Sequence, residues 1–555
     1  MAKGKTATQQ WDEEVDLLVA GSGAAAMSAA IAGADAGLKV LIVESTDKWG
    51  GTTAMSGGGL WMPNHPDMKK VGKEDSREDV LTYMDTVIGD VGPASSKERR
   101  EAFVDTVPVV YTEWQHLGIE WALSADYPDY YPDKPGGMDG GRAIETKPFN
   151  SKRLGDWFDK SRAMVPIPVK TDDVWLLSRA WVSPSGFWRG AQFVGRTLRG
   201  ILAGKKYYGM GGAYVGHLMR VVLDQGTEVR LSTPITKVIK DDAGVAIGAE
   251  VSSPEGTKRI KARAGIMLGT GGFAANKAWR LKHHGIEGYT SAPEGDLGSG
   301  IQVGMDAGGD TALMDDAWWG ASLVTLDGNV SFSVNERSNP YSIIVDQSGA
   351  RFTNESASYI DVGHDILERD KTVPAIHSWM ITDRRHQKRY LNTTALQGLK
   401  KLREAGSVIE ADTLEELAEK LELDKDTFKA TIQRFNKFAR NGVDEDFERG
   451  RTAYDNYYGD PSLKNPNLGP IERGPFRAFK VVPGDLGTKG GLLTDEHARV
   501  LDTAGKPIDG LYAAGNASAA VMGRTYPGAG STIGPATVFG FLGAKHAAAR
   551  VASAA

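Results

Sequence analysis

The chain has 555 residues, 41% hydrophobic and 25% charged, so it can bury a large core and should form two or three domains. Its formal net charge of -6 provides no electrostatic attraction for nucleic acid. The chain has no cysteine, which excludes disulfides, thiolate metal sites and iron–sulfur clusters, and we predict no metal site. The sequence has neither a signal peptide nor a run of about 18 apolar residues, so we expect a cytoplasmic protein.

The first chemical signal is a glycine turn between a strand and a helix. Residues 15–20 (VDLLVA) form an apolar run rich in β-formers, followed by Gly21-Ser22-Gly23 and an alanine-rich stretch to Ala36. In this arrangement the backbone can approach a pyrophosphate, and the helix N-terminus faces it with unpaired N–H groups. A second apolar run ends in Glu44, where such folds place an acid for a ribose hydroxyl. This unit predicts dinucleotide binding, of NAD or FAD.

Three further segments favour FAD. Residues 50–59 (GGTTAMSGGG) resemble the pyrophosphate-covering segment of fumarate reductase type flavoenzymes, which a NAD-binding domain does not need. Residues 266–272 (IMLGTGG) and 510–516 (GLYAAGN) resemble strands that complete such FAD domains. Because residues 50–59 include no His, we expect non-covalent FAD. The predicted FAD contacts are Gly21, Ser22, Gly23, Ala24, Ala25, Ala26, Glu44, Ser45, Gly50, Gly51, Thr52, Thr53, Ser56, Gly57, Gly58, Gly271, Gly272, Gly515, Asn516, Thr532 and Ile533.

The order of these segments predicts an α/β fold with a discontinuous, Rossmann-like FAD-binding domain. We expect this domain to comprise residues 1–295 and 484–555, with an α+β catalytic domain inserted at 296–483. The inserted part contains aromatic-rich loops and an amphipathic helical region at residues 413–439. We predict that it holds the substrate.

One segment differs from the mean composition. Between Val174 and Leu223 there is no Asp or Glu, while basic residues alternate with aromatic ones. An insertion of this kind, at about residues 174–210, suggests peripheral contact with the inner face of a membrane, with aromatic rings at headgroup level. A packing helix or a contact between copies of the chain explains the same pattern equally well. The basic and aromatic residues include Trp175, Arg179, Trp181, Phe187, Trp188, Arg189, Phe193, Arg196, Arg199, Lys205 and Lys206.

Four motifs resemble those of the 3-ketosteroid Δ1-dehydrogenases, and the resemblance covers almost the whole chain. They are residues 127–132 (YPDYYP), 354–359 (NESASY), 484–491 (GDLGTKGG) and 526–534 (YPGAGSTIG). The resemblance implies an FAD-dependent oxidoreductase acting on CH–CH bonds, which introduces a C1–C2 double bond beside the C3 ketone of a steroid. It also implies an electron acceptor, a quinone or another oxidant. The long basic insertion fits a 3-ketosteroid that keeps its side chain, such as cholest-4-en-3-one.

Desaturation beside a ketone requires donors to the carbonyl oxygen, a base for the α-proton and a hydride acceptor. The hydroxyl of Tyr526 and the N–H of Gly530 are the candidate donors, since one turn carries both. The resemblance assigns the base to Tyr359. A phenol of pKa about 10 is a weak base at neutral pH, so it needs help from a neighbour. The resemblance assigns this help to Tyr130, although the adjacent Tyr131 stays open.

Other functions compete with this one. A fumarate reductase type enzyme shares the FAD segments but needs arginine and histidine clamps for two carboxylates. His364, His377 and Arg337 lack that spacing. A third possibility is a steroid enzyme that desaturates the C4–C5 bond. A lipid-binding module with an unused flavin would carry the same basic insertion.

Overall fold

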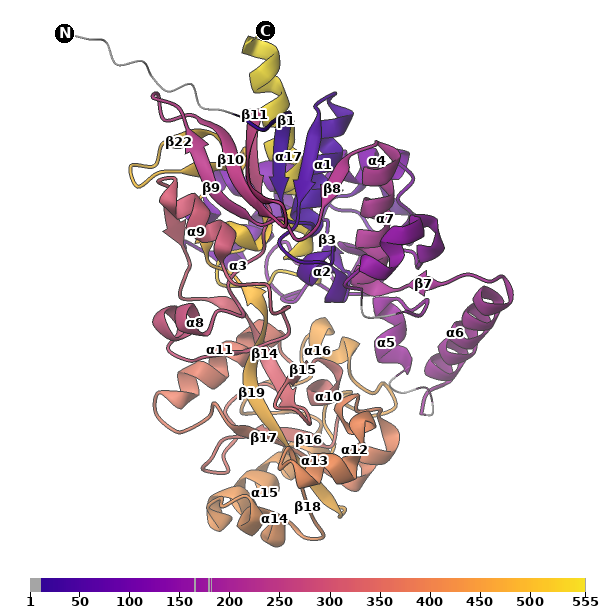
Figure 1. Cartoon of the computed structure of the whole chain (residues 1–555). Helices are drawn as coiled ribbons and strands as arrows, with labels where there is room; N and C mark the ends of the chain where they lie inside the picture. Colours follow the sequence, from indigo (N-terminus) through magenta and orange to yellow (C-terminus); the bar gives the residue numbers. More distant parts are fainter. Residues whose placement is uncertain (1–10, 164–165, 178–179, 181, 555) are drawn as a thin grey trace, which may run out of the picture.

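The computed structural model describes residues 11–163, 166–177, 180 and 182–554. It has two units, which lie one above the other in Figure 1. The upper unit is built on an eight-stranded sheet and the lower unit on a seven-stranded one.

Five parallel strands form the centre of the upper sheet. Their order is β22 (Pro507–Ala513), β11 (Gly256–Leu268), β1 (Glu13–Ala20), β2 (Val40–Val43) and β8 (Glu228–Arg230). Three antiparallel strands extend it, namely β9 (Ile235–Lys240), β10 (Ala246–Ser253) and β21 (Arg499–Leu501). Every residue of β2 is buried, as expected for a parallel strand that is covered on both faces.

Alternate residues of β1 serve two different hydrophobic cores. Leu17 and Val19 pack in the core that contains α1 (Ala24–Asp35) and α17 (Ile533–Ala554). Leu18 packs on the opposite face, in a core that includes Ile301 of α9 (Ser299–Asp306). Helices therefore cover both faces of this sheet, which identifies the doubly covered α/β architecture that the sequence predicts.

The lower sheet is organised around the long strand β19 (Phe476–Thr488). Antiparallel neighbours of β19 are β14 (Ala317–Val324), β17 (Ser378–Thr382) and β18 (Val408–Ala411), and β12 (Tyr289–Thr290) pairs with it in parallel. The outer strands are β15 (Val330–Phe332) and β16 (Ser342–Val345). The helical region predicted at residues 413–439 is two helices, α14 (Leu414–Lys420) and α15 (Lys425–Asn441). The other helices here are α10 (Asn335–Ser338), α11 (Tyr359–Asp370), α12 (Arg384–Arg389), α13 (Leu399–Glu404) and α16 (Ala453–Tyr457).

The remaining helices and strands complete the chain. The described helices not yet named are α2 (Gly51–Met55), α3 (Arg77–Ile88), α4 (Lys97–His116), α5 (Thr171–Leu177), α6 (Pro184–Leu202), α7 (Met210–Asp224) and α8 (Lys277–His284). Strands β3 (Leu60–Trp61), β4 (Trp121–Leu123) and β5 (Ala143–Thr146) form a small sheet. Two further pairs are β6 (Phe149–Asn150) with β7 (Tyr207–Tyr208), and β13 (Thr311–Ala312) with β20 (Gly491–Leu492).

The packing of two elements bears on the predicted domain boundaries at 295 and 483. Helix α9 follows residue 295 in the chain, yet its apolar side packs against β9 of the upper sheet. Strand β19 continues past residue 483 as far as Thr488 while still paired with β14. We therefore propose that the catalytic domain begins close to β14 and ends close to Thr488.

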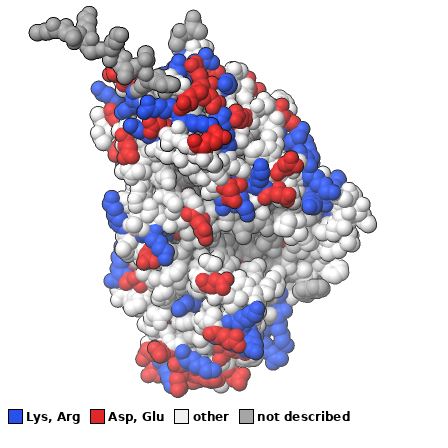
Figure 2. Space-filling model, in the orientation of Figure 1, with Lys and Arg blue, Asp and Glu red and all other residues white. Residues whose placement is uncertain are grey.

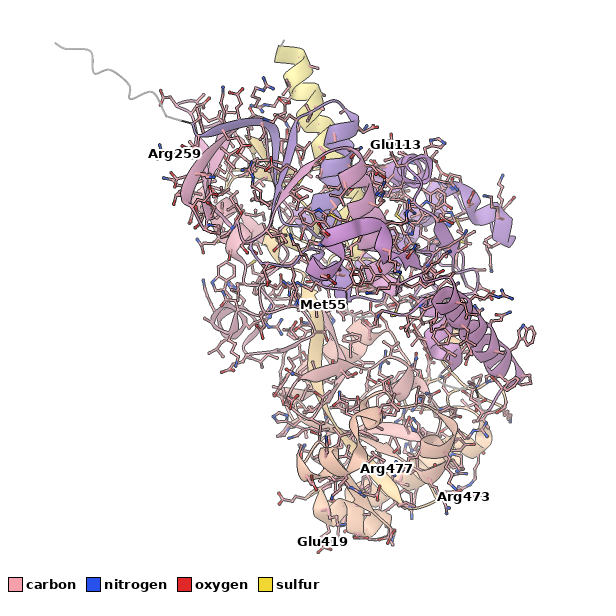
Figure 3. All side chains as sticks on the ribbon, turned by 45° about the vertical axis from the view of Figure 1, so that its right-hand side comes forward. Met55, Glu113, Arg259, Glu419, Arg473 and Arg477 are labelled. Atoms are coloured by element: carbon pink, nitrogen blue, oxygen red, sulfur yellow. The ribbon has the colours of Figure 1, made fainter. Side chains whose placement is uncertain are left out.

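Helix α6 projects from the side of the molecule (Figures 1 and 3). Arg179 and Trp181 of the predicted basic insertion lie outside the described residues, as does the side chain of Trp175. Within the described part of the chain, no helix has the length and apolar character needed to cross a bilayer.

Candidate active site

A large cavity lies where the two units meet. It has a volume of about 540 Å³ and is partly open to solvent. Its walls come from the glycine turn after β1, from α2, and from residues of both units. Figure 3 labels Met55, one of the lining residues, at the level between the units. The cavity volume lies within the range of small-molecule sites, about 300–1,000 Å³, and its lining extends from the glycine turn to residues of the lower unit.

One end of the cavity has the donors and acceptors that a dinucleotide requires. Helix α1 begins after Gly23 without a cap from that residue; the N–H of Ala24 donates to the Thr53 hydroxyl at 3.2 Å, and the other first-turn N–H groups can face an anion. Gly21 has a φ of 102°, and a Cβ there would lie 2.3 Å from the carbonyl oxygen of Gly269. The carboxylate of Glu44 is held by the hydroxyl of Ser22 at 2.6 Å, which places it to accept from ribose hydroxyls. These residues fit FAD.

Most of the predicted FAD contacts line this cavity. They are Gly21, Ser22, Gly23, Ala24, Ala25, Glu44, Ser45, Gly51, Thr52, Thr53, Ser56, Gly57, Gly58, Gly271, Gly515, Asn516, Thr532 and Ile533. Ala26, Gly50 and Gly272 lie behind the wall. Ala26 is fully buried against Gly269, and the N–H of Gly50 donates to the Ser22 hydroxyl at 3.0 Å. Gly272 packs so closely on Thr488 that a Cβ would meet its hydroxyl oxygen at 2.1 Å.

The four predicted catalytic residues also line the cavity and lie together. The ring centroids of Tyr359 and Tyr526 are 4.8 Å apart, and that of Tyr130 lies 5.3 Å from Tyr359 and 5.2 Å from Tyr526. These residues come from three separate segments: the loop after β4, the start of α11 and the turn before α17. Gly530, with a φ of 92°, approaches Gly59 so closely that a Cβ would lie 2.3 Å from its carbonyl oxygen.

Burial dominates the acidity of this cluster. It raises the pKa of Tyr359 well above its usual range, and the neighbouring Tyr526 raises it further. The hydrogen bond from Tyr130 lowers the pKa of Tyr359. Burial also raises the pKa of Tyr526, while hydrogen bonds from Tyr359 and Thr532 lower it. Tyr359 therefore has a donor to its oxygen and can itself donate to Tyr526.

The two adjacent tyrosines left open by the sequence have different environments. Tyr130 lines the cavity. Tyr131 does not, and its hydroxyl donates to Asp361 at 2.8 Å. Trp318, Trp319 and Tyr341 are buried without reaching the cavity wall, and Trp318 supports Tyr526 edge-on at 5.3 Å.

Sequence reasoning missed several lining residues. Tyr127 and Tyr458 line the cavity, their hydroxyls are hydrogen-bonded, and the Tyr127 hydroxyl is 3.4 Å from that of Tyr130. The available signals were the motif at residues 127–132 for Tyr127 and the tyrosine-rich run at residues 454–458 for Tyr458. Burial raises the pKa of Asp296, another lining residue, to about 7. Further lining residues outside the motifs include Arg162, Thr171, Val174, Phe332, Val334, Glu336 and Thr393, and Leu486 lies within the motif at residues 484–491.

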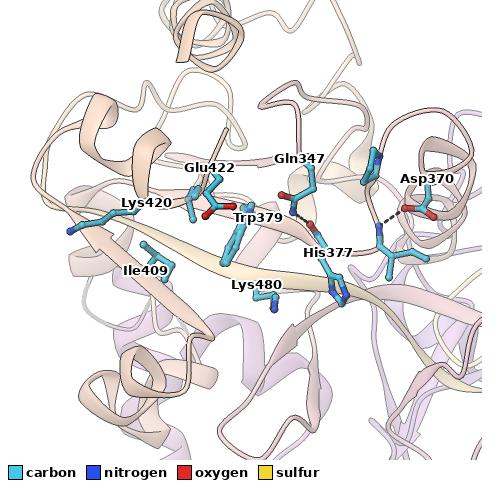
Figure 4. Close-up of a pocket in the computed structure, with 11 residues that line it drawn as sticks. Gln347, Asp370, His377, Trp379, Ile409, Lys420, Glu422 and Lys480 are labelled. Carbon is cyan, nitrogen blue, oxygen red and sulfur yellow. Dashed lines mark hydrogen bonds between the residues drawn. The ribbon is translucent and has the colours of Figure 1, made fainter. Parts of the chain in front are cut away.

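A smaller pocket on the lower unit is separate from this site (Figure 4). It surrounds Trp379 with two lysines, Lys420 and Lys480, and two acids, Asp370 and Glu422, so it has no excess of either charge. His377 belongs to this pocket and not to the large cavity. None of the predicted site residues lines it.

Comparison with known proteins gives the family. The model of the FAD binding domain family matches residues 16–533. A 3-oxosteroid 1-dehydrogenase of Mycobacterium tuberculosis is 41% identical over 97% of this chain and 98% of its own. A 4-oxocyclohexanecarboxylate 2-dehydrogenase of Sinomonas cyclohexanicum is 33% identical over 97% of this chain and 93% of its own.

A solved structure agrees with these matches. The 3-ketosteroid Δ1-dehydrogenase of Sterolibacterium denitrificans, in complex with 1,4-androstadiene-3,17-dione, superimposes with a TM-score of 0.90. It is 33% identical and covers 97% of this chain and 100% of its own. The predicted α/β fold and the predicted cofactor FAD are thereby confirmed. The chain belongs to the FAD-binding oxidoreductase family that includes the 3-oxosteroid 1-dehydrogenases.

Proposed function

We propose that this protein is a 3-ketosteroid Δ1-dehydrogenase, which removes one hydrogen each from C1 and C2 of the steroid A ring. The observation that carries this proposal is the mutual contact of Tyr130, Tyr359 and Tyr526 in the cavity that also contains the dinucleotide turn. The similarity to 3-oxosteroid 1-dehydrogenases over nearly the whole chain supports the same reaction.

In this proposal the C3 carbonyl oxygen binds between the Tyr526 hydroxyl and the N–H of Gly530. Negative charge grows on that oxygen as the proton leaves C2, and fixed donors stabilise it best where water is excluded. Tyr526 is 3% exposed, so its hydroxyl lies in such an environment. Gly530 has a positive φ, and this backbone conformation allows its close approach to Gly59.

Tyr359 in its deprotonated form accepts the C2 proton, and the hydrogen bond from Tyr130 stabilises this phenolate before the transfer. When bound, FAD supplies the hydride acceptor for the hydrogen that leaves C1. Phe332, whose ring centroid is 5.0 Å from that of Tyr359, and Val334 provide apolar wall for the flat steroid nucleus. The protein thus contributes the position of the ketone and the base.

An anaerobic titration of the yellow protein with androst-4-ene-3,17-dione tests this function. We expect bleaching of the flavin absorbance and formation of the 1,4-diene product. Formation of a C4–C5 double bond from a saturated 3-ketosteroid would instead identify a Δ4-dehydrogenase. A flavin that no 3-ketosteroid bleaches, but that fumarate reoxidises after chemical reduction, would contradict the proposal.

The arginine and histidines considered for a dicarboxylate clamp have other partners or positions, which weighs against the fumarate reductase alternative. Arg337 is fully buried and donates to backbone carbonyls, including that of Ala357 at 2.9 Å. His364 pairs with Asp316 at 2.9 Å, and His377 lines the separate pocket of Figure 4.

The exposed face of α6 favours a membrane surface with anionic lipid as a further binding partner. Phe187, Val194, Leu198 and Ile201 are 53–66% exposed and recur at helical spacing along one side. Arg189 and Arg196 turn inward to Asp173, whereas Lys205 is exposed beyond the helix end. The part of this projection turned to the viewer in Figure 2 has few charged side chains. An amphipathic helix with an apolar stripe and flanking cations binds in the plane of such a membrane.

The position of α6 connects this surface to the substrate. Helix α6 packs on α5, and Thr171 and Val174 of α5 line the cavity. A steroid that keeps its apolar side chain partitions into lipid and would reach the cavity from this side. We therefore propose cholest-4-en-3-one as a substrate, with a higher kcat/KM in the presence of vesicles than without them.

Vesicle sedimentation tests the membrane contact. Wild-type protein should pellet with phosphatidylglycerol vesicles, and the Val194→Ser/Leu198→Ser/Ile201→Ser variant should stay in the supernatant. Leu396→Ser is the matched control, since Leu396 is a leucine of the lower unit that is 70% exposed. If the wild type does not pellet but is a dimer in solution, and the triple variant is a monomer, then α6 is a contact between copies of the chain. The membrane proposal is then wrong.

A further inference from the structure

The three catalytic tyrosines each have a near neighbour in the sequence that turns away from the cavity. These neighbours are Tyr131, Thr525 and Asp361, which lie beside Tyr130, Tyr526 and Tyr359 respectively. None of the three lines the cavity. They are nevertheless bonded to one another behind its wall.

Hydrogen bonds connect these neighbours in a chain. The Thr525 hydroxyl donates to the Tyr131 hydroxyl at 3.0 Å, and the Tyr131 hydroxyl donates to the Asp361 carboxylate at 2.8 Å. We propose that Thr525, Tyr131 and Asp361 form a hydrogen-bonded lock that sets the relative positions of Tyr526, Tyr130 and Tyr359. This inference rests on the dehydrogenase function proposed above, and it assigns the three residues a positioning role.

A second set of hydrogen bonds connects the segment that carries Tyr130 to the turn that carries Tyr526. The carbonyl oxygen of Pro527 accepts from the N–H of Tyr130 at 2.9 Å and from the hydroxyl of Tyr83 at 2.6 Å. The Tyr83 hydroxyl in turn accepts from the N–H of Tyr131 at 3.2 Å. The backbone at Tyr130 and Tyr131 is thus fixed to the turn at Pro527. The third segment, which carries Tyr359, has no part in these bonds, and Asp361 joins it to the other two.

The charge on Asp361 strengthens its bond to Tyr131. Burial raises the pKa of Asp361 to about 6, and Asp365 raises it, while the bond from Tyr131, His364 and Lys489 lower it. The group is therefore a carboxylate at pH 8, and a hydrogen bond to a charged acceptor is roughly twice as strong as a neutral one. The ammonium of Lys489 also donates to the carbonyl oxygen of Thr525 at 3.1 Å, so the first member of the chain is held as well.

Such a lock matters because the tyrosines come from three segments far apart in the sequence. Their rings meet at centroid distances of 4.8–5.3 Å. Catalysis requires the base and the carbonyl donors to stay within about 0.5 Å of the productive geometry, and a shift of about 1 Å costs about 10²-fold in rate. Loss of the lock should therefore slow the chemical step more than it weakens binding.

The test compares two substitutions of one residue. Thr525→Val removes the hydroxyl at constant shape, whereas Thr525→Ser keeps the hydroxyl and removes a methyl group. We expect the rate of flavin reduction by androst-4-ene-3,17-dione, measured anaerobically by stopped flow, to fall at least tenfold in Thr525→Val and less than threefold in Thr525→Ser. The steroid Kd and the FAD content should change less than twofold in both. Tyr131→Phe should reproduce the Thr525→Val result.

The outcomes separate the lock from the function itself. If wild type is reduced by the steroid but Thr525→Val is reduced equally fast, the lock is wrong and the function stands. If Thr525→Ser is slower than Thr525→Val, packing and not hydrogen bonding holds the turn, and the lock is wrong. If Thr525→Val does not retain FAD, the rate measured for Tyr131→Phe supports or overturns the lock by the same tenfold criterion. A wild-type flavin that no 3-ketosteroid reduces overturns both proposals.

Discussion

The hydroxyl of Tyr359 lies in a buried cluster of tyrosines. The dipoles of neighbouring protein groups are therefore the main source of stabilisation for this hydroxyl. Burial raises its pKa, and a single donor, Tyr130, opposes this effect. The protonated phenol is thus the resting form at neutral pH. Buried hydroxyls in contact also affect one another, so the tyrosines titrate as a group. This residue-scale environment leads to two predictions.

The first prediction concerns pH. The base must be deprotonated to accept the C2 proton, and its raised pKa means that the deprotonated fraction grows with pH up to alkaline values. We expect kcat/KM for androst-4-ene-3,17-dione to rise from pH 7 to pH 10, with circular dichroism confirming that the protein stays folded. A kcat/KM that is flat or falls over this range would show that Tyr359 is not the titrating base.

The second prediction concerns the Tyr359 hydroxyl. Tyr359→Phe should reduce turnover by about 10²–10⁴-fold, the usual contribution of a general base, while FAD absorbance and steroid binding persist. Tyr454→Phe is a matched control, because Tyr454 packs on Tyr130 with ring centroids 4.4 Å apart and its hydroxyl has no hydrogen-bond partner among the described residues. Steady-state kinetics on both variants measure the effect. Comparable losses in the two would remove Tyr359 as the base.

The elements around the FAD site are positioned by close backbone approaches. The turn from β1 into α1 passes against the end of β11, and only a residue without a Cβ fits there with a φ of 102°. A similar approach at Gly530 holds the turn before α17 against Gly59. These contacts bring elements together that are far apart in the chain, and they form the shared wall of the cofactor and substrate sites.

The third prediction tests this approach with two glycines. Gly21→Ala places a Cβ 2.3 Å from the Gly269 carbonyl oxygen, so we expect purified protein with little FAD and a lower melting temperature. Gly37→Ala is the control, since Gly37 also has a positive φ, 82°, but nothing lies within 4 Å of the added Cβ. The ratio of flavin to protein absorbance measures the effect. Equal FAD loss in the two variants would indicate backbone strain alone and not the contact at the turn.

At the scale of the whole molecule, a buried ion pair connects helix α8 to the long strand β19. Arg280 of α8, which follows the upper sheet in the chain, forms an ion pair with Asp485 of β19 at 2.8 Å. Both side chains are fully buried, and the Arg280 guanidinium also lies 4.8 Å from the centroid of a Trp319 ring. The pair fixes α8, which follows the upper sheet in the chain, to strand β19 of the lower sheet.

The fourth prediction removes this pair. Arg280→Met leaves the carboxylate of Asp485 buried without a counter-ion, which typically costs about 3–5 kcal/mol. We expect a clear fall in the urea midpoint followed by tryptophan fluorescence. Arg77→Met removes an ion pair with Asp105 in which both side chains are exposed, and it should leave the urea midpoint almost unchanged. A similar midpoint for the two variants would contradict a connecting role for Arg280.

The sequence by itself determined the dinucleotide turn, the FAD segments and the motifs that carry the proposed catalytic tyrosines. These features are local, since glycine spacing and strand–turn–helix order depend on residues adjacent in the chain. It did not determine that residues 299–306 pack on the upper sheet, because one short amphipathic helix fits either neighbour.

The tertiary structure alone decided which adjacent tyrosine faces the cavity, that Tyr127 and Tyr458 join it, and that Thr525, Tyr131 and Asp361 are bonded behind it. Side-chain direction in a loop depends on contacts with distant segments, here up to 394 residues away, which no local pattern contains. The cavity therefore depends on the approach of both units, whereas the chemistry of its parts is already present in the sequence.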